Sequence, residues 1–397
     1  MKKLFVPFLV CIHFFAFAQQ EVDLYNRANI QFQYQNYDEA IALLTNAVIA
    51  KPDYADAFAL RGDCYYYLKE YNTAIENYLK AEGLKKGRSS YNLACTYALS
   101  GNINDAFKYL ETNLSSEYKL RLSQINVDPD LESLRKDPRW NGLVQKPWYT
   151  PYELALHEAD DKINANDLAG SLASETQAIS LNPNDDRAYG LRAILYIRSG
   201  EMQKALEDLN QAIRLKPQSV YYGNRGYVNN KLKNSEQTLA DYEKAIALDP
   251  TNLVYYDLAM ARFGAGKKAE ALDALKKHTT YFTRDEMGYY FAGIVASQLN
   301  EFNEALSFLN KGIEINGSTY QLYMKRADTY FLMKRFEQAI ADYDKVIELE
   351  PSFGEAYYIR GNAKGEMRDK DGACADWRKA VQLGFQDENG YIASICD

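Results

Sequence analysis

The sequence predicts an all-α protein, an α-solenoid superhelix built from helix–turn–helix units. Three observations predict this class: a period of about 34 residues, two columns of small residues within each period, and prolines that close several of the periods. The composition agrees, because 47% of the 397 residues are hydrophobic and 25% are charged, ordinary values for a protein that folds in water. The 33 tyrosines are many for such a chain and indicate a repeated structural position.

The first 18 residues have the pattern of a secretory signal. Two lysines precede an apolar run, which is followed by Ala16-Phe17-Ala18, the small residues at which a signal peptidase cleaves. The run is shorter than the roughly 20 apolar residues that a membrane-spanning helix needs. We expect residues 1–18 to be a signal peptide, and the mature chain to be exported to the periplasm or the cell exterior, including the cell surface. An uncleaved anchor and a lipid attached at Cys11 are the alternatives.

The charge balance argues against nucleic acid as a partner. The chain has 54 acidic and 46 basic residues, a net charge of −8, and removal of Lys2 and Lys3 makes it more negative. A nucleic-acid surface needs a basic stripe to neutralise phosphates, whereas the basic residues here form only short pairs such as Lys85-Lys86. No second stretch approaches 18 apolar residues, so we expect neither nucleic-acid binding nor stable membrane insertion after signal cleavage.

Ten segments can be aligned on their small residues. They begin at Glu21, Ala55, Gly87, Tyr152, Asp186, Ser219, Asn252, Glu286, Tyr320 and Gly354. The eighth position is small in all ten, being Ala28, Gly62, Ala94, Ala159, Ala193, Gly226, Ala259, Gly293, Ala327 and Gly361. Twelve residues later a second small column follows: Ala40, Ala74, Ala106, Ser171, Ala205, Thr238, Ala271, Ala305, Ala339 and Ala373. Two small columns at this spacing predict two helices that cross closely in every unit.

Turn and boundary residues complete each unit. Between the two columns lie turn formers: Asn36, Gly101, Gly200, Gly266 and Asn300. Prolines, which cannot continue a helix, close five units: Pro52, Pro183, Pro217, Pro250 and Pro351. These boundaries predict three units within residues 19–115 and seven within residues 152–385.

The repeated residues resemble the tetratricopeptide repeat, whose unit of 34 residues carries a fixed pattern of small and aromatic positions. Two units match the pattern best, with Phe58, Gly62, Tyr65, Ala74, Tyr78 and Ala81 in the second and Tyr323, Ala327, Tyr330, Phe336, Ala339, Tyr343 and Pro351 in the ninth. The resemblance covers most of the mature chain and accounts for the tyrosines, since the fourth position of the unit repeatedly holds one. It implies a superhelix of helix pairs.

Residues 116–151 depart from the period. They contain Asp128-Pro129-Asp130-Leu131 and Trp140 in place of a unit, and resemble a bacterial variant in which short helices cover the exposed face of the preceding repeat. Trp140 and Trp148 are expected to be packing anchors. Residues 145–150 form either a hinge or a continuation of the superhelix, and the sequence leaves both open.

The C-terminal segment 386–397 is expected to cap the last unit, because a solenoid exposes an apolar face at its end. This ending resembles that of other exported repeat proteins, with one cysteine in the last long helix and one in the cap. The resemblance implies a disulfide between Cys374 and Cys396, the alternative being two independent thiols. Cys64 and Cys95 are expected to be buried free thiols, although a pairing between them stays open.

The sequence indicates no catalytic chemistry. The mature chain has His157 and His278 on different units, no CxxC pair, and no glycine-rich phosphate loop after a strand. We therefore expect no enzyme activity, no catalytic residues, no structural metal and no cofactor.

The resemblance implies instead a concave face for partner binding, formed by five positions of each first helix. Carried over to this chain, those positions give aromatic and methionine side chains: Phe32, Tyr66, Tyr67, Tyr227, Tyr256, Met260, Phe263, Tyr290, Phe331 and Tyr358. Exposed aromatics are typical of peptide and protein recognition. The expected function is a scaffold or adaptor in the bacterial cell envelope that binds a peptide or protein partner. The alternative is a glycan or cell-wall binding protein that uses the same groove beside Asp63, Asp160 and Asp328.

Overall fold

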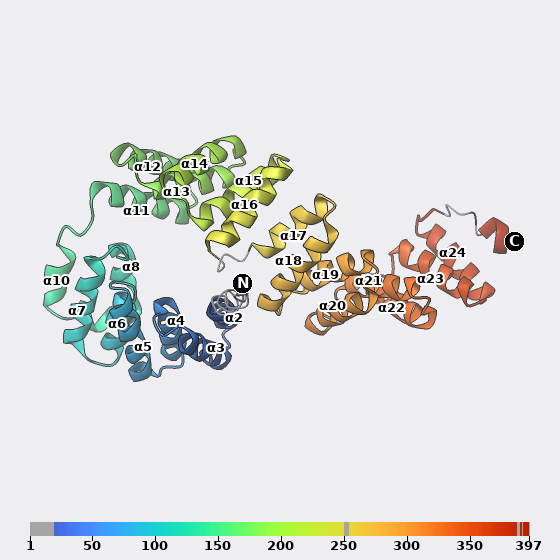
Figure 1. The fold of residues 1–397 in the computed structure, drawn as a ribbon, viewed down its shortest axis with the longest axis horizontal. Helices are drawn as coiled ribbons and strands as arrows, with labels where there is room; N and C mark the ends of the chain where they lie inside the picture. Colours follow the sequence, from blue (N-terminus) through green and yellow to red (C-terminus); the bar gives the residue numbers. More distant parts are fainter. Residues whose placement is uncertain (1–19, 250–253, 387–389, 391, 397) are drawn as a thin grey trace, which may run out of the picture. The chain divides into compact units, whose positions relative to one another are not determined.

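The computed structural model describes residues 20–249, 254–386, 390 and 392–396 (Figure 1). The expected signal peptide, residues 1–18, lies outside the described residues. Every regular element in the described ranges is helical, so the predicted all-α solenoid is confirmed there. In the part of the chain that is described, no helix is long and apolar enough to cross a membrane.

The chain divides into two compact units. The first comprises Met1–Asn234 with Lys244–Asn252, and the second comprises Ser235–Glu243 with Leu253–Asp397, so the division falls within α16 (Ser235–Leu248). Residues 145–150, where the sequence left a hinge open, lie inside the first unit.

Among the described residues, the first unit contains eleven regular repeat helices before the division and a run of short helices. The repeat helices are α2 (Gln20–Gln33), α3 (Tyr37–Ala50), α4 (Ala55–Tyr67), α5 (Tyr71–Leu84), α6 (Ser90–Leu99), α7 (Ile103–Leu114), α11 (Pro151–Asn164), α12 (Leu168–Leu181), α13 (Asp186–Arg198), α14 (Met202–Leu215) and α15 (Ser219–Lys231).

The repeat helices of the second unit follow the same alternation. They are α17 (Tyr255–Gly264), α18 (Lys268–Tyr281), α19 (Glu286–Gln298), α20 (Phe302–Ile315), α21 (Tyr320–Leu332), α22 (Phe336–Leu349), α23 (Gly354–Glu366) and α24 (Lys370–Gln382).

The small columns let the two helices of a unit approach each other closely. At Gly62 a Cβ atom would lie 2.6 Å from the ring of Tyr78, and at Gly361 it would lie 2.7 Å from the ring of Trp377. An aromatic ring therefore packs directly on the backbone of the partner helix. The second column supplies Ala74 in the unit of Gly62 and Ala373 in the unit of Gly361, and both alanines are buried. This packing confirms the helix crossing that the two columns predicted.

An arginine and an aspartate join the two helices of several units. Arg192 pairs with Asp208 at 2.7 Å, and Arg326 pairs with Asp342 at 2.6 Å. The same two positions of the last unit hold Arg360 and Asp376. Each pair connects the first helix of a unit to its own second helix, which fixes the geometry inside the unit.

The short helices that replace a repeat pack on the preceding pair. They are α8 (Leu122–Val127), the 3-10 helix η1 (Pro129–Leu131), α9 (Glu132–Arg135) and α10 (Arg139–Val144). Helices η1 and α9 contact α6, and α9 also contacts α7. Leu131, Leu134 and Trp140 are buried in one core with residues of α6 and α7, whereas Trp148 is partly buried against it. Both tryptophans are thus packing anchors, as expected.

The C-terminal helix η2 (Ile392–Cys396) packs on α24. A disulfide joins Cys374 of α24 to Cys396 of η2, the pairing that the resemblance implied. Cys64 and Cys95 are free and buried. Residues 387–389, 391 and 397 of the expected cap lie outside the described residues.

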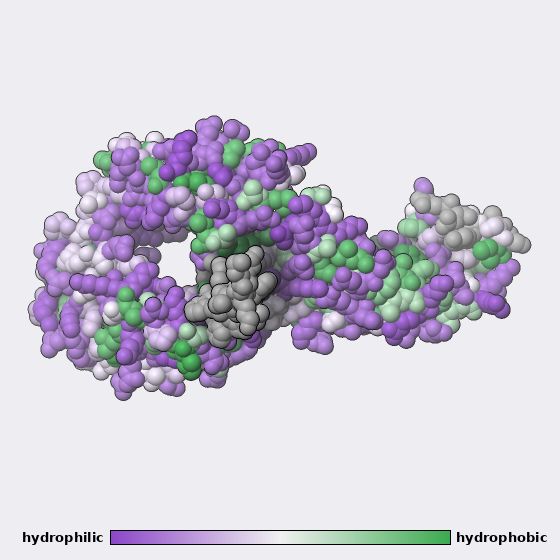
Figure 2. Space-filling view, viewed as in Figure 1, coloured by the Kyte–Doolittle hydropathy of each residue, from purple (hydrophilic) through white to green (hydrophobic). Residues whose placement is uncertain are grey.

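Hydrophobic residues that define the repeats lie mainly between helices. Most of the alanines of the small columns are fully buried. Figure 2 shows a largely hydrophilic face on which hydrophobic residues form separate patches. The apolar stripes are therefore used up by packing within and between repeats, and the patches that stay exposed are candidates for recognition.

Candidate functional site

The first unit contains a cavity of about 350 Å³, which we call the acidic pocket. Its walls come from α2, α4, α5, α6 and the short-helix segment. The residues that line it are Phe32, Asp63, Tyr66, Tyr67, Tyr78, Tyr91, Asn92, Cys95, Asp128 and Asp130. Three carboxylates and four phenol rings thus meet in one cavity, and three of the residues, Phe32, Tyr66 and Tyr67, were predicted to face a partner.

Aromatic rings form one wall of the acidic pocket. The ring of Phe32 lies 5.5 Å from that of Tyr67, edge to face, and Tyr67 also contacts Tyr66 at 5.5 Å. On its other side Tyr67 stacks on Tyr37 at 5.4 Å. Tyr67 nevertheless remains 56% exposed. The rings hold one another in place while leaving a flat aromatic surface open to a ligand.

Asp63 lies deep in the acidic pocket, on α4. Its Oδ1 accepts hydrogen bonds from the hydroxyl of Tyr78 at 2.8 Å and from the amide of Asn92 at 2.6 Å. Burial raises the pKa of the Asp63 carboxyl, although these two hydrogen bonds and the positive charge of Arg88 lower it. The net direction is upward because the neutral donors do not replace the water that burial removes.

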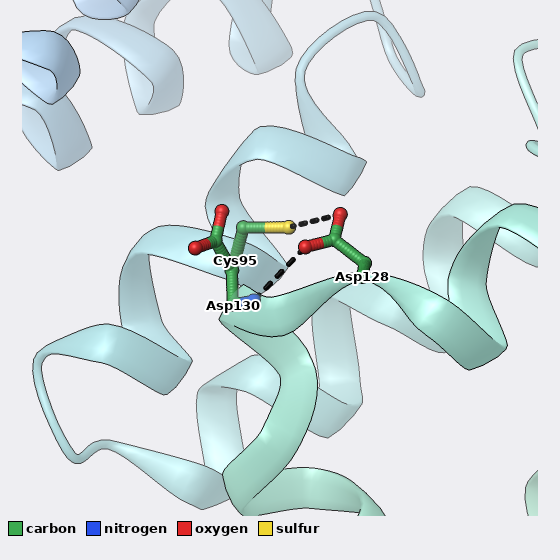
Figure 3. A group of neighbouring side chains, drawn as sticks. All are labelled: Cys95, Asp128 and Asp130. Atoms are coloured by element: carbon green, nitrogen blue, oxygen red, sulfur yellow. Dashed lines mark hydrogen bonds between the residues drawn. The ribbon is translucent and has the colours of Figure 1, made fainter.

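The short-helix segment contributes the other two carboxylates. The hydroxyl of Tyr91 donates to Asp128 at 2.5 Å, and the hydroxyl of Tyr66 donates to Asp130. Asp128 also accepts from the backbone N–H of Asp130 at 2.9 Å, which caps η1. Figure 3 shows the thiol of Cys95 directed at the carboxylate of Asp128, with a separation of 4.0 Å. The segment is therefore attached to the repeats through the acids of the pocket.

Positive charge is kept outside the acidic pocket. No lysine or arginine is among its lining residues. Arg88 pairs with Asp56 at 2.7 Å, and Arg135 donates to the backbone carbonyl of Asp128 rather than to its carboxylate. Within the described residues, none of the three pocket carboxylates forms an ion pair with a lysine or arginine. The pocket is consequently an acidic site lined by aromatic rings.

Cys95, Asp128 and Asp130 also form a group whose ligand atoms lie within 4.8 Å of one another (Figure 3). A metal ion would need the thiolate form of cysteine. Burial, followed by the charges of Asp128 and Asp130, raises the pKa of the Cys95 thiol, so the protonated thiol is the stable form. The three groups supply fewer ligands than the four of a closed zinc site. This donor set favours a hydrogen-bonded cluster over a metal centre.

The remaining predicted face residues lie elsewhere. Tyr227 is 37% exposed on α15 of the first unit. In the second unit, Tyr256 contacts His278 at 5.3 Å and Phe291 at 5.8 Å, so its ring is partly buried. Tyr290 packs edge to face on Phe291 at 5.3 Å. Met260 of α17 is likewise half-buried, and Phe263 packs against the core that includes Ala259.

Two further predicted residues lie at the C-terminal end of the second unit. Phe331 lines a cavity of about 630 Å³ together with Asn362 and Trp377, whose indole N–H donates to Asn362 at 2.9 Å. Tyr358 is only 7% exposed, because its ring packs on Phe385 at 4.8 Å in the core around the disulfide. Tyr358 is thus a core residue and not part of an accessible face, a correction to the prediction.

Sequence reasoning did not place Asp128 and Asp130 in a site. Both belong to the segment without a repeat pattern, so no register connects them to α4 and α6. The sequence predicts only packing or pattern roles for Tyr78, Tyr91, Asn92 and Cys95. The Asp128-Pro129-Asp130 sequence could have pointed to these residues, because aspartates beside a proline are typical of a tight turn with a defined conformation.

Models of the tetratricopeptide repeat match the chain at residues 25–90, 156–220, 220–252, 288–319 and 320–353. A TPR repeat-containing protein of Methanocaldococcus jannaschii is 25% identical over 291 residues, 66% of this chain and 49% of the relative. Hsp70-Hsp90 organizing protein 2 of Arabidopsis thaliana is 25% identical over 234 residues, 48% of this chain and 41% of the relative. The chain thus spans about half the length of these relatives or less.

A solved structure shows the same fold. The C-terminal part of a TPR repeat-containing protein from Cytophaga hutchinsonii superposes with a TM-score of 0.52 at 20% sequence identity. The match covers 60% of this chain and 99% of that chain. At this identity the likeness extends to the arrangement of helices and not to the residues of a site.

Proposed function

The chain belongs to the tetratricopeptide repeat proteins, and from this premise we propose that it is a non-catalytic interaction scaffold that binds a protein partner through an extended peptide segment. Proteins of this family mediate protein–protein interactions. The relatives named as organizing proteins of Hsp70 and Hsp90 are consistent with such a role. The observation that carries the proposal here is the aromatic wall of the acidic pocket, which stays open although every ring in it is held by neighbours.

The aromatic wall fits a peptide better than a flat protein surface. Tyr67 is more than half exposed and is pinned between Phe32 and Tyr37. Rigid rings of this kind bury a large apolar area on binding at little cost in conformational entropy. The cavity of about 350 Å³ that these rings help to line has room for a single side chain. An extended segment can therefore lie along the rings and insert one residue.

The groups in the acidic pocket are arranged for binding rather than reaction. Each carboxylate already accepts a hydrogen bond from a tyrosine hydroxyl. The Cys95 thiol is held in its protonated form, which is a poor nucleophile. No histidine is among the lining residues, and the carboxylates, the other candidate bases, are already engaged by these tyrosine hydroxyls.

We place this scaffold in the bacterial cell envelope, where its partner would be an envelope protein. The proposal rests on the leader pattern of residues 1–18 and on the Cys374–Cys396 disulfide, a bond that persists in oxidising compartments.

The test is affinity capture from a bacterial envelope extract with the chain from Gln19 onward. Three baits are compared: the parent, Tyr67→Ala in the aromatic wall, and Ile49→Ala as a control. Ile49 is 71% exposed on α3 and does not line the pocket, so it matches the loss of exposed apolar area without touching the site.

We expect the parent and Ile49→Ala to capture the same protein, and Tyr67→Ala to capture at least about fivefold less, since an aromatic anchor contributes 1 kcal/mol or more. Direct binding is then measured with the purified partner. Equal capture by all three baits contradicts a role for the aromatic wall. Retention on peptidoglycan without any protein partner contradicts the scaffold and favours the glycan alternative.

A further inference from the structure

We infer that the acidic pocket accepts a lysine or arginine side chain of the bound peptide, which gives the scaffold a preference for basic segments. This inference rests on the proposed function and adds the chemistry of the residue that the pocket takes. Three features support it: the carboxylates without an ion-pair partner, the aromatic wall that lines the same cavity, and the size of the cavity.

Among the described residues, the carboxylates of the pocket have no lysine or arginine as an ion-pair partner. Asp63 is bonded only by neutral donors, from Tyr78 and Asn92. Asp128 and Asp130 likewise accept from tyrosine hydroxyls, a thiol and a backbone N–H. A carboxylate bonded only by neutral groups is costly to hold in its charged form away from water unless a cation approaches. A basic side chain would supply that cation.

A repeat unit elsewhere in the chain shows what the pocket is missing. In the ninth unit, Asp328 accepts a hydrogen bond from Tyr343 at 2.9 Å, just as Asp63 accepts one from Tyr78. Asp328 is also neutralised by Lys325 at 2.9 Å. The position of Lys325 in its unit is held by Leu60 in the second unit. The second unit thus has the acid and the tyrosine but no lysine at this position.

The aromatic wall suits the stem and the head of a basic side chain. Lysine and arginine bury their methylene chains along apolar surface while the charged end reaches a polar group. Phe32, Tyr66 and Tyr67 provide such a surface beside the carboxylates. A cation within about 6 Å of a ring face gains further attraction from the ring. An uncharged aliphatic residue would use the rings but leave the acids unpaired.

The size of the cavity restricts the occupant to one side chain. Ligand pockets commonly measure about 300–1,000 Å³, and 350 Å³ is near the lower end. Acids line the cavity from two elements: Asp63 comes from α4, whereas Asp128 and Asp130 come from the short-helix segment. A charged head can therefore contact more than one of them.

The test is selection of peptides from a random library displayed on phage, run in parallel with and without EDTA. The baits are the parent, Asp130→Asn in the pocket, and Asp160→Asn as a control. Asn is close to Asp in shape and retains an acceptor for the Tyr66 hydroxyl, so the pocket keeps its hydrogen bond but loses charge. Asp160 occupies in the fourth unit the position that Asp63 occupies in the second, outside the pocket. Thermal unfolding followed by circular dichroism shows that each bait is folded.

We expect peptides selected on the parent and on Asp160→Asn to share a lysine or arginine at one position. Replacing that lysine by norleucine in the synthetic peptide should weaken binding to the parent at least about tenfold, and Asp130→Asn should remove most of this difference. Should Asp130→Asn fail to fold, Tyr67→Ala is used with the same peptide pair, and weaker binding of the lysine peptide is expected because the ring face is lost.

The outcomes separate this inference from the proposed function. Selected peptides without a shared basic residue, or a lysine-to-norleucine change without effect, overturn the inference and leave the scaffold intact. A library that yields no binder to any bait, with or without EDTA, overturns both. Selection that succeeds only without EDTA, and is restored by Zn²⁺, places a metal ion in the pocket and overturns the basic side chain as its occupant.

Discussion

The second and fourth repeat units differ at one place where their helices meet. In the second unit Tyr78 of α5 donates its hydroxyl to Asp63 of α4. The fourth unit keeps the aspartate, Asp160, but has Glu175 in place of the tyrosine. Glu175 is fully buried, and neither of its carboxylate oxygens has a hydrogen-bond partner. The same fold therefore tolerates either a satisfied acid or an unsatisfied one at this crossing.

The ninth unit has a third arrangement, in which Asp328 accepts a hydrogen bond from Tyr343 and forms an ion pair with Lys325. The three arrangements show that the packing of the helix pair and the charge at the crossing are set by different residues. The helix pair forms in every case, so the pattern of small residues decides the fold. The polar partners decide where negative charge remains, and this charge is what distinguishes the acidic pocket from the equivalent site in the ninth unit.

The largest effect is expected from Glu175→Gln. Burial, followed by the charge of Asp160, raises the pKa of Glu175 from 4.5 to about 8, although Arg192 lowers it. The folded state thus favours the neutral acid. Between pH 4.5 and 8 the carboxyl ionises in the unfolded chain but stays neutral in the folded one, so the free energy of unfolding falls progressively over this range. Glutamine cannot ionise, so the variant should be more stable than the parent at pH 9 by on the order of 2–4 kcal/mol. At pH 4.5 the difference should be within about 1 kcal/mol.

Urea unfolding at both pH values, followed by circular dichroism, measures this difference. Glu158→Gln is the control, because Glu158 is an exposed residue of α11 paired with Lys162 and should show little dependence on pH. Equal gains for the two variants at pH 9 would contradict a special role for burial at Glu175.

A smaller effect is expected on comparing Tyr78→Phe with Tyr343→Phe. Each change removes one hydroxyl from a buried site and leaves the ring in place. Tyr78→Phe should lower the free energy of unfolding by about 1–2 kcal/mol, because Asp63 is left with Asn92 alone. Tyr343→Phe should lower it by about 0.5–1 kcal/mol, because Lys325 still pairs with Asp328. Urea unfolding measures both, and a larger loss for Tyr343→Phe would reverse the comparison.

The smallest effect is expected from Lys325→Met, which gives the ninth unit an acid without a cation. Lysine and aspartate are both partly exposed here, so the loss should be about 0.5 kcal/mol at low salt. The loss should shrink in 1 M NaCl, where screening has already weakened the pair. Lys311→Met, in an exposed pair with Glu314, is the control for removing a surface lysine. A loss that does not change with salt would indicate a packing effect instead.

The repeat pattern predicted the fold because each unit is held by contacts close in sequence. Gly62 and Tyr78, or Gly361 and Trp377, meet across a single helix crossing, so their spacing along the chain carries the geometry. The aromatic wall was predicted in part for the same reason, since Phe32, Tyr66 and Tyr67 occupy repeated positions of successive units.

The rest of the site could not be predicted, because it depends on contacts outside the period. Asp128 and Asp130 reach the pocket from a segment whose packing follows no register. Tyr358 occupies a repeated position, yet the residue that covers it, Phe385, follows the last regular helix. In both cases the deciding neighbour lies where the repeat has ended or been replaced.

The attachment of the short-helix segment to the pocket has a consequence for how such a protein diversifies. The aromatic wall belongs to the repeats, whereas two of the three acids belong to residues 128–130. Substitutions in that turn would change the charge of the pocket without altering the small residues at which the repeat helices cross. The charge of the pocket can therefore change through residues 128–130 while the small columns that hold the repeats together stay the same.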